Sequence, residues 1–109
     1  MIRVEIVLPK NDVMAISEGL KQVHVGGVLV NKVRGRDKYP PPEIHASLGR
    51  QIFMPQFGYK YVIEVVVPES KEKDVIKIVR DNSKLGKIFI SQVSRAVDIG
   101  TGNEGNEVI

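Results

Sequence analysis

Apolar and charged residues alternate over the first eight positions of the chain. The apolar members are Ile2, Val4, Ile6 and Leu8. They fall on one face of an extended segment, because side chains of a strand point alternately to its two sides. Residues 2–8 are therefore predicted to form a strand, which Pro9 ends.

Two later segments repeat their apolar residues at helical spacing. The first contains Val13, Ile16, Leu20 and Val23. Asn11 or Asp12 is expected to cap this helix, and Gly26–Gly27 to break it. The second helix begins after Pro68, and its apolar positions are Val75, Ile76, Ile78 and Val79.

Three further strands are predicted over residues 28–34, 60–67 and 87–93. In the second of these, Tyr61, Ile63, Val65 and Val67 share one face. A short extended piece, residues 95–99, precedes a polar tail. The resulting order, β-α-β-β-α-β, predicts a single α+β domain of the ferredoxin-like class over residues 1–109. Two helices can cover only one face of its sheet, so the other face is expected to pack on another subunit.

The connection between the second and third strands is far longer than the two to five residues that such a turn requires. It covers residues 36–59 and contains four of the six prolines, at positions 40, 41, 42 and 55. It also carries apolar residues, namely Leu48, Ile52, Phe53, Met54 and Phe57. We interpret it as a loop that contacts a partner or ligand. The alternative is an insertion without consequence.

Composition narrows the class of protein. The chain has 109 residues, of which 42% are hydrophobic and 27% charged, and it contains no cysteine. The amino terminus carries charges where a signal peptide needs an apolar run, and no apolar stretch reaches the length of a membrane span. We expect a cytoplasmic protein without membrane insertion. The net charge of +3 suits an anionic ligand, but it is also an ordinary solubility charge.

No pattern in the chain indicates catalysis. The two histidines, His24 and His45, have no obvious third ligand, so no metal site is predicted. No serine is part of a recognisable arrangement with a histidine and an acid. The sequence therefore predicts a protein that is not an enzyme.

Four segments, in order and at the expected separations, resemble the P-II family of nitrogen-regulatory signalling proteins. They are GVLVNKVRG at residues 27–35, KYVIEVVVP at 60–68, GKIFI at 86–90 and TGNEG at 101–105. The resemblance implies a homotrimer with three clefts between subunits. In the family each cleft holds ATP or ADP, and 2-oxoglutarate joins through magnesium. It also implies that the long loop, the T-loop of the family, engages transporters, enzymes or transcription regulators.

The resemblance places one end of the ligand site on two strands. Leu29 and Val66 fall in the adenine pocket, with Leu29 standing where the family usually has a threonine. Glu64 and Lys60 match an acidic and a basic position near the cleft, and Lys60 matches the lysine that pairs with 2-oxoglutarate. The run into the loop supplies Gly35, Arg36, Asp37 and Lys38.

The phosphate end departs from the family pattern. Gly86 and Lys87 remain from its glycine-rich phosphate loop, but the stretch is about five residues shorter than the family's, counted from the proline that ends the preceding strand. Asp98-Ile99-Gly100 stands where the family has Arg-x-Arg. A carboxylate repels a triphosphate, so we expect binding of ATP and 2-oxoglutarate to be weakened or lost. No cofactor is certain from the sequence. The candidates are a nucleotide of the ADP or AMP type and another small anion.

A basic stripe leads into the loop. Its members are Lys32, Arg34, Arg36 and Lys38, which recur at every second residue. The stripe either holds an anion or is the solvated face of an edge strand. No aromatic residue is interleaved with it along the chain and the net charge is low, so we expect no nucleic-acid partner.

The loop lacks the modification chemistry of the family. Phe53 falls where bacterial relatives have a uridylylated tyrosine, and Gln51 where some have a phosphorylated serine. The candidate partner-binding residues are Tyr39, Ile52, Phe53 and Phe57, with Tyr39 near the place of a family glutamine.

Two functions remain open from the sequence. The first is a divergent P-II-like protein that senses a small anionic metabolite or nucleotide and regulates a partner in nitrogen or related metabolism. The second is a ligand-independent trimeric interaction module that binds a transporter or an enzyme.

Overall fold

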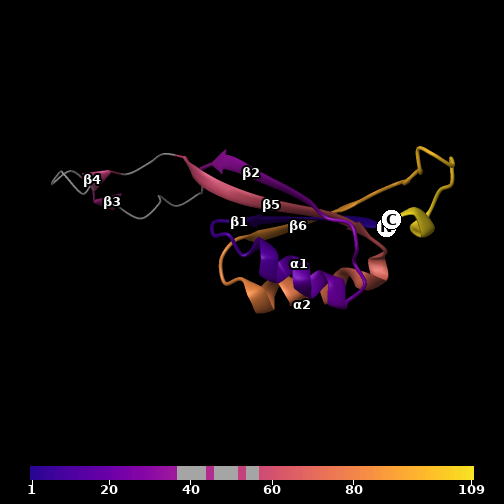
Figure 1. Cartoon of the computed structure of the whole chain (residues 1–109), viewed down its shortest axis with the longest axis horizontal. Helices are drawn as coiled ribbons and strands as arrows, with labels where there is room; N and C mark the ends of the chain where they lie inside the picture. The colour runs from indigo at the N-terminus through magenta and orange to yellow at the C-terminus, as the bar shows by residue number, and fades with distance from the viewer. Residues whose placement is uncertain (37–43, 46–51, 54–56) are drawn as a thin grey trace.

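The structure, a computed structural model, describes residues 1–36, 44–45, 52–53 and 57–109. Its main feature is a four-stranded antiparallel sheet with the strand order β2-β5-β1-β6 (Figure 1). The strands are β1 (Ile2–Leu8), β2 (Leu29–Gly35), β5 (Gly58–Val67) and β6 (Lys87–Gln92). The central pair is β5 and β1, and β2 and β6 are the edges. The predicted ferredoxin-like order of elements is confirmed.

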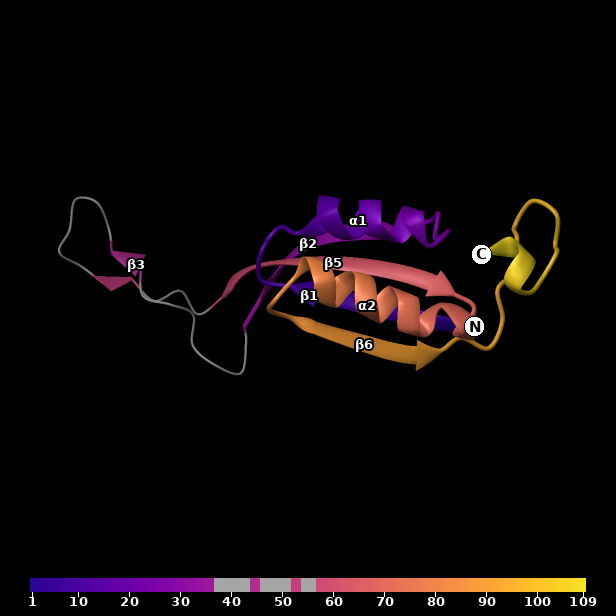
Figure 2. The same ribbon diagram turned by 90° about the horizontal axis from the view of Figure 1, so that it is seen from below.

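Two helices cover one face of this sheet, as Figures 1 and 2 show from two directions. They are α1 (Val13–Gln22) and α2 (Glu72–Asn82), and a short 3-10 turn, η1 (Glu69–Lys71), precedes α2. The core lies between the helices and the sheet. From the sheet it contains Ile2, Val4, Ile6, Leu8, Ile63, Val65 and Val67, and from the helices Ile16, Leu20, Val75 and Val79. The predicted apolar faces of β1, β5 and both helices are therefore confirmed.

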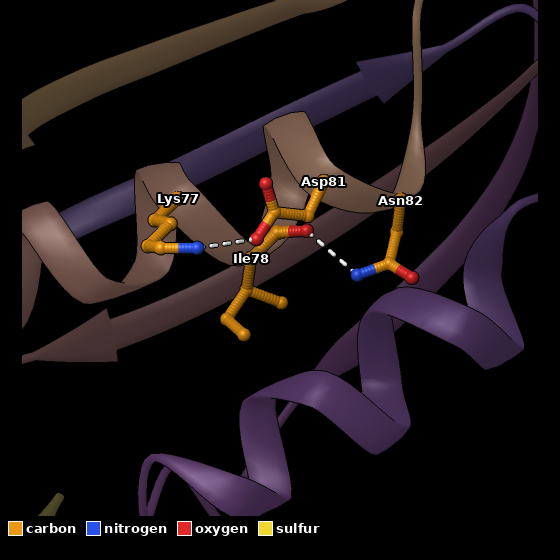
Figure 3. Close-up of polar contacts among 4 residues, drawn as sticks. All are labelled: Lys77, Ile78, Asp81 and Asn82. Atoms are coloured by element: carbon orange, nitrogen blue, oxygen red, sulfur yellow. Dashed lines mark hydrogen bonds and ion pairs between the residues drawn. The ribbon is translucent and has the colours of Figure 1, made fainter.

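The two helices approach each other at Gly19. A Cβ atom at this position would lie 2.6 Å from Cγ2 of Ile78 on α2, which is closer than packed carbon atoms can come. At the same end of α2, the Asn82 amide donates a 2.8 Å hydrogen bond to the Ile78 carbonyl, and Lys77 pairs with Asp81 (Figure 3). The absence of a side chain at Gly19 lets α1 and α2 share one layer.

The ends of α1 differ from the prediction. Asp12 precedes the helix, but its side chain makes no capping hydrogen bond. The helix also ends before the two glycines, because His24 adopts a left-handed conformation with φ 63°. The His24 and Val25 amides then bond the Lys21 and Leu20 carbonyls, which satisfies two carbonyls at the helix end. A histidine takes the place that glycine usually fills in this motif.

The segments outside the sheet also differ from the expectation. Residues 95–99 do not form a strand, and only Val97 pairs, through an isolated bridge to Glu104. A 3-10 turn, η2 (Asn106–Val108), follows. Within the long loop, β3 (Ile44–His45) pairs with β4 (Ile52–Phe53) in an antiparallel ladder that the sequence did not predict.

The sheet face opposite the helices combines charged and apolar residues. The strand register puts Leu29, Glu64, Glu5 and Phe89 in one row across all four strands. Leu29 and Phe89 are 65% and 53% exposed. None of the helices in the described part of the chain has the length and apolarity that a membrane crossing requires.

Candidate functional site

A hollow of about 300 Å³ lies beside the ends of β2 and β5. Its lining includes Gly27, Leu29, Glu64, Val66, Val108 and Ile109. The predicted adenine-pocket residues Leu29 and Val66 therefore line the same hollow as Glu64, and the carboxy-terminal residues add a wall that the sequence did not predict. The walls are mostly apolar, which suits a flat or apolar part of a ligand.

Glu64 and Lys71 bring opposite charges to this hollow, and residues of β1 set the environment of Glu64. Its carboxylate forms a 2.9 Å ion pair with the Arg3 guanidinium. The register also places Glu64 directly opposite Glu5, where two like charges repel. Arg3 offsets that repulsion and holds Glu64 in place. This ion pair could not be predicted from the sequence, because it depends on the pairing of two strands that are distant along the chain.

Lys60 lies at the other end of β5 and is buried, with 8% of its surface exposed. It stands opposite Val33 on β2. A Cβ atom at Gly35 would lie 3.2 Å from Cγ of Lys60, so the missing side chain at Gly35 leaves room for the lysine stem. These two predicted residues are therefore neighbours at the base of the long loop. Arg36, the next residue, is exposed.

Gly86 and Lys87 lie at a second hollow of about 310 Å³, beside the connection from α2 to β6. Gly86 has φ 124°, and a Cβ atom there would collide with the Val7 carbonyl oxygen. Only glycine fits this position without strain. Arg80 and Lys84 line the same hollow as Lys87, so three cations are available to an anion there.

Asp98 is engaged in a turn of the tail. Its carboxylate accepts hydrogen bonds from the Thr101 amide (2.8 Å) and the Thr101 hydroxyl (3.0 Å). These bonds, the amide first, hold the pKa of Asp98 below its ordinary value. The Arg95–Glu104 ion pair, with a 2.7 Å N–O distance, closes the same turn. Asp98 thus stabilises the turn as an anion.

Two members of the basic stripe lie on β2, next to tyrosines of β5. Lys32 and Arg34 share one face of β2, opposite Tyr61 and Tyr59 on β5. The Lys32 ammonium lies 4.3 Å from the centre of the Tyr59 ring, and the Arg34 guanidinium 5.2 Å. No aromatic residue is interleaved with these cations along the chain, but tyrosines of the neighbouring strand lie beside them. Lys38 lies outside the described residues.

The structure brings the predicted ligand residues together in three groups of one chain. Leu29, Glu64 and Val66 form one group, Gly35 and Lys60 a second, and Gly86 and Lys87 a third. Asp37 and Tyr39 lie outside the described residues, and the side chains of Ile52 and Phe53 do as well. Phe57 is 53% exposed. Among the described residues, no three histidine or acidic side chains gather as a metal site would require.

The comparisons with known proteins agree with this architecture. The family model described as "Nitrogen regulatory protein P-II" matches residues 1–103. The "Nitrogen regulatory protein P-II" of Haemophilus influenzae is 30% identical over 100 residues, which cover 86% of this chain and 87% of that protein. The protein of the same description from Rhizobium meliloti is 26% identical over the full length of both chains.

Solved structures show the same fold. B. subtilis GlnK superposes with a TM-score of 0.77 at 24% identity, covering 99% of this chain and 97% of that chain. A B. subtilis GlnK–ATP complex gives the same TM-score and identity. The fold is thus that of a P-II signalling domain. The chain belongs to the P-II family of nitrogen regulatory proteins, whose members are signal transducers and not enzymes, as the sequence predicted.

Proposed function

We propose that this protein works as a homotrimer that senses a small anionic metabolite, or a nucleotide with fewer phosphates than ATP, and regulates a partner protein through its long loop. The observation that carries the proposal is the contrast between the two ends of the expected ligand site. The hollow around Leu29, Glu64 and Val66 is present. At the other end Asp98, a carboxylate held in a turn, stands at the position to which the family resemblance assigns an arginine.

The phosphate end gives the strongest restriction on the ligand. An arginine contributes a charge-assisted hydrogen bond of about 1.5–3 kcal/mol to an anion. Asp98 and Gly100 supply neither guanidinium, and Asp98 adds a negative charge. The cations Arg80, Lys84 and Lys87 line the other hollow and offer a smaller anion a site. We therefore expect weak or absent ATP binding, and no magnesium-dependent binding of 2-oxoglutarate.

Regulation requires the ligand site to communicate with the loop. β2 and β5 line the hollow at one end, and at the other end they lead into the two sides of the loop. Lys60 and Gly35 lie at that junction. A ligand that binds one arrangement of this junction more tightly than another shifts the population of loop conformations, and no chemical step is needed.

The second candidate is a ligand-independent trimeric module whose loop binds a transporter or an enzyme. Leu29 favours it, because this side chain supplies no hydroxyl to a base or ribose. In that case the hollow binds no ligand, and the loop binds its partner at all metabolite concentrations.

Thermal melting with ATP, ADP, AMP, cyclic nucleotides, 2-oxoglutarate and bicarbonate separates the two candidates. A true ligand raises stability by about 2.7 kcal/mol at a hundredfold excess over its dissociation constant. We expect one of the smaller anions to raise the melting temperature and ATP to have little effect. The Leu29→Thr variant is the matched control, because it returns a hydroxyl to the hollow and should strengthen any nucleotide response. No response to any compound, in the protein or in the variant, would favour the ligand-independent module.

A further inference from the structure

The Lys32–Arg34–Tyr59 cluster has no role in the ligand site described above. It lies on the helix side of β2 and β5, because Lys32 and Arg34 stand opposite Tyr61 and Tyr59, whereas Lys60 and Val33 point to the other side. Neither of the two hollows that the ligand residues line includes it. Its position is the base of the long loop, where β2 ends and β5 begins (Figure 1).

The cluster presents only hydrogen-bond donors to its surroundings. The Arg34 guanidinium donates a 3.3 Å hydrogen bond to the Tyr59 oxygen, which leaves the phenol hydrogen free to point outward. The Lys32 ammonium adds three donors beside it. Neither Lys32 nor Arg34 is in the ion pairs formed between described residues by Arg3, Lys21, Lys77 and Arg95. An arrangement of two cations and one hydroxyl matches the oxygens of an anion.

The two cations are gathered over one aromatic ring despite their like charge. Cation–π attraction to Tyr59 holds both in place. The same positive field lowers the pKa of the Tyr59 hydroxyl, mainly through the Arg34 hydrogen bond and then through the charges of Arg34 and Lys32. The positive field that lowers this pKa also attracts an external anion to the same place.

The surroundings of the cluster favour a protein as the source of that anion. Both cations are exposed, and exposed ion pairs contribute little by themselves, so an occupant needs adjoining contacts. Phe57 precedes β5 by one residue and is 53% exposed, as is Tyr59. Arginine and tyrosine beside an exposed apolar ring are typical of protein–protein interfaces. Two cations on a chain of net charge +3 are a weak attraction for nucleic acid.

We propose that Lys32, Arg34 and Tyr59 form an anchor for a carboxylate on an acidic segment of the partner protein. This inference deepens the proposed function, since it gives the chemistry of the partner that the loop would meet. It assigns the recognition of charge to the rigid strands at the base of the loop and leaves apolar contacts to the loop itself.

The test is binding of a fluorescein-labelled peptide in which glutamate alternates with serine, followed by fluorescence anisotropy at low salt. The informative variant is Lys32→Gln/Arg34→Gln. Its matched control is Lys73→Gln/Lys77→Gln, which removes the same charge from exposed positions of α2 that line neither hollow. We expect the cluster variant to bind about tenfold more weakly and the control to stay within about twofold of the unmodified protein. Tyr59→Phe keeps the ring, loses the hydroxyl, and should bind about two- to threefold more weakly.

Several results would overturn the anchor. If both double variants lose the same peptide affinity, the net charge of the protein explains the binding and the anchor is contradicted. If the unmodified protein does not bind the peptide, the anchor is also contradicted. Displacement of the peptide by inorganic phosphate at the same anion concentration would assign the cluster to a small anion. Stronger binding to phosphatidylglycerol vesicles than to the peptide would assign it to a membrane surface. None of these outcomes bears on the metabolite-dependent melting, which tests the proposed function separately.

Discussion

The two faces of the sheet differ in how much apolar surface they leave exposed to water. The face toward α1 and α2 is complete, because Ile2, Val4, Ile6 and Leu8 are at most 2% exposed. On the opposite face, Leu29 and Phe89 are largely exposed and stand in one row with the carboxylates of Glu5 and Glu64. The covered face therefore supplies the hydrophobic core, and the open face carries most of the residues that the family resemblance assigns to the ligand.

This division explains why the ligand residues of one chain fall into separate groups. Glu64 and Val66 project from the open face of β5, and Lys87 from that of β6, with β1 between them. A cleft formed against a neighbouring subunit would enclose such residues, and one chain alone leaves them apart. The exposed apolar side chains of the open face then become interface residues.

The largest expected effect comes from removing a core side chain on the covered face. Ile6→Ala leaves a cavity under the helices and should reduce the free energy of unfolding by about 2–5 kcal/mol. Urea unfolding at fixed protein concentration measures this. Phe89→Ala on the open face is the matched comparison, and it should change the stability of the separate chain by less than about 1 kcal/mol while weakening assembly. Similar losses of chain stability in both variants would show that the faces do not differ in this way.

A smaller effect is expected where the helices meet. Gly19→Ala adds a methyl group 2.6 Å from Ile78 Cγ2. Overpacking of this kind costs about 1–3 kcal/mol, partly offset by about 1 kcal/mol from the higher helix propensity of alanine. We expect a net loss in the melting transition. Gly19→Ala/Ile78→Val retains Cγ2 and should recover little, whereas Gly19→Ala/Ile78→Ala should relieve the collision. A more stable Gly19→Ala protein would contradict the close approach.

The smallest effect concerns the tail and depends on pH. The pKa of Asp98 is lower in the folded protein than in the unfolded chain, because the Thr101 amide and hydroxyl bind the carboxylate. Ionised Asp98 therefore stabilises the turn fully above the unfolded-state pKa of about 3.9, and this contribution is lost as the pH falls through the lower, folded-state pKa. NMR titration of the Thr101 amide should report the change at acid pH. Asp98→Asn should abolish that transition, and a transition unchanged in this variant would assign it to another group.

Much of the fold could be predicted from the sequence, because its elements are strongly periodic. The alternation of β1 and β5 and the helical spacing of Ile16 and Leu20 all correspond to buried faces. The prediction failed where a local motif used an unusual residue. His24 ends α1 in a left-handed conformation that is usually adopted by glycine. The sequence therefore predicts the end of the helix too late, at the nearby glycines.

The candidate site was less predictable, because its contacts join residues far apart in the chain. Leu29, Glu64 and Val66, which the family resemblance assigns to the ligand, line one hollow. The resemblance did not reveal that Arg3 pairs with Glu64 or that Tyr59 lies under Lys32 and Arg34, since both contacts depend on strand register. The turn at Asp98 differs from these contacts, because its hydrogen-bonding partner Thr101 lies nearby in the sequence.

The most direct test of the division between the two faces is the mass of the protein in solution. Light scattering at micromolar concentration should give three times the chain mass of 12.1 kDa, because the open face leaves large apolar side chains exposed and the family resemblance implies a trimer. Phe89→Ala should lower that mass on dilution before the unmodified protein does so. A mass of one chain at micromolar concentration would contradict the proposal, since the open face would then be stable in water and no clefts between subunits would exist.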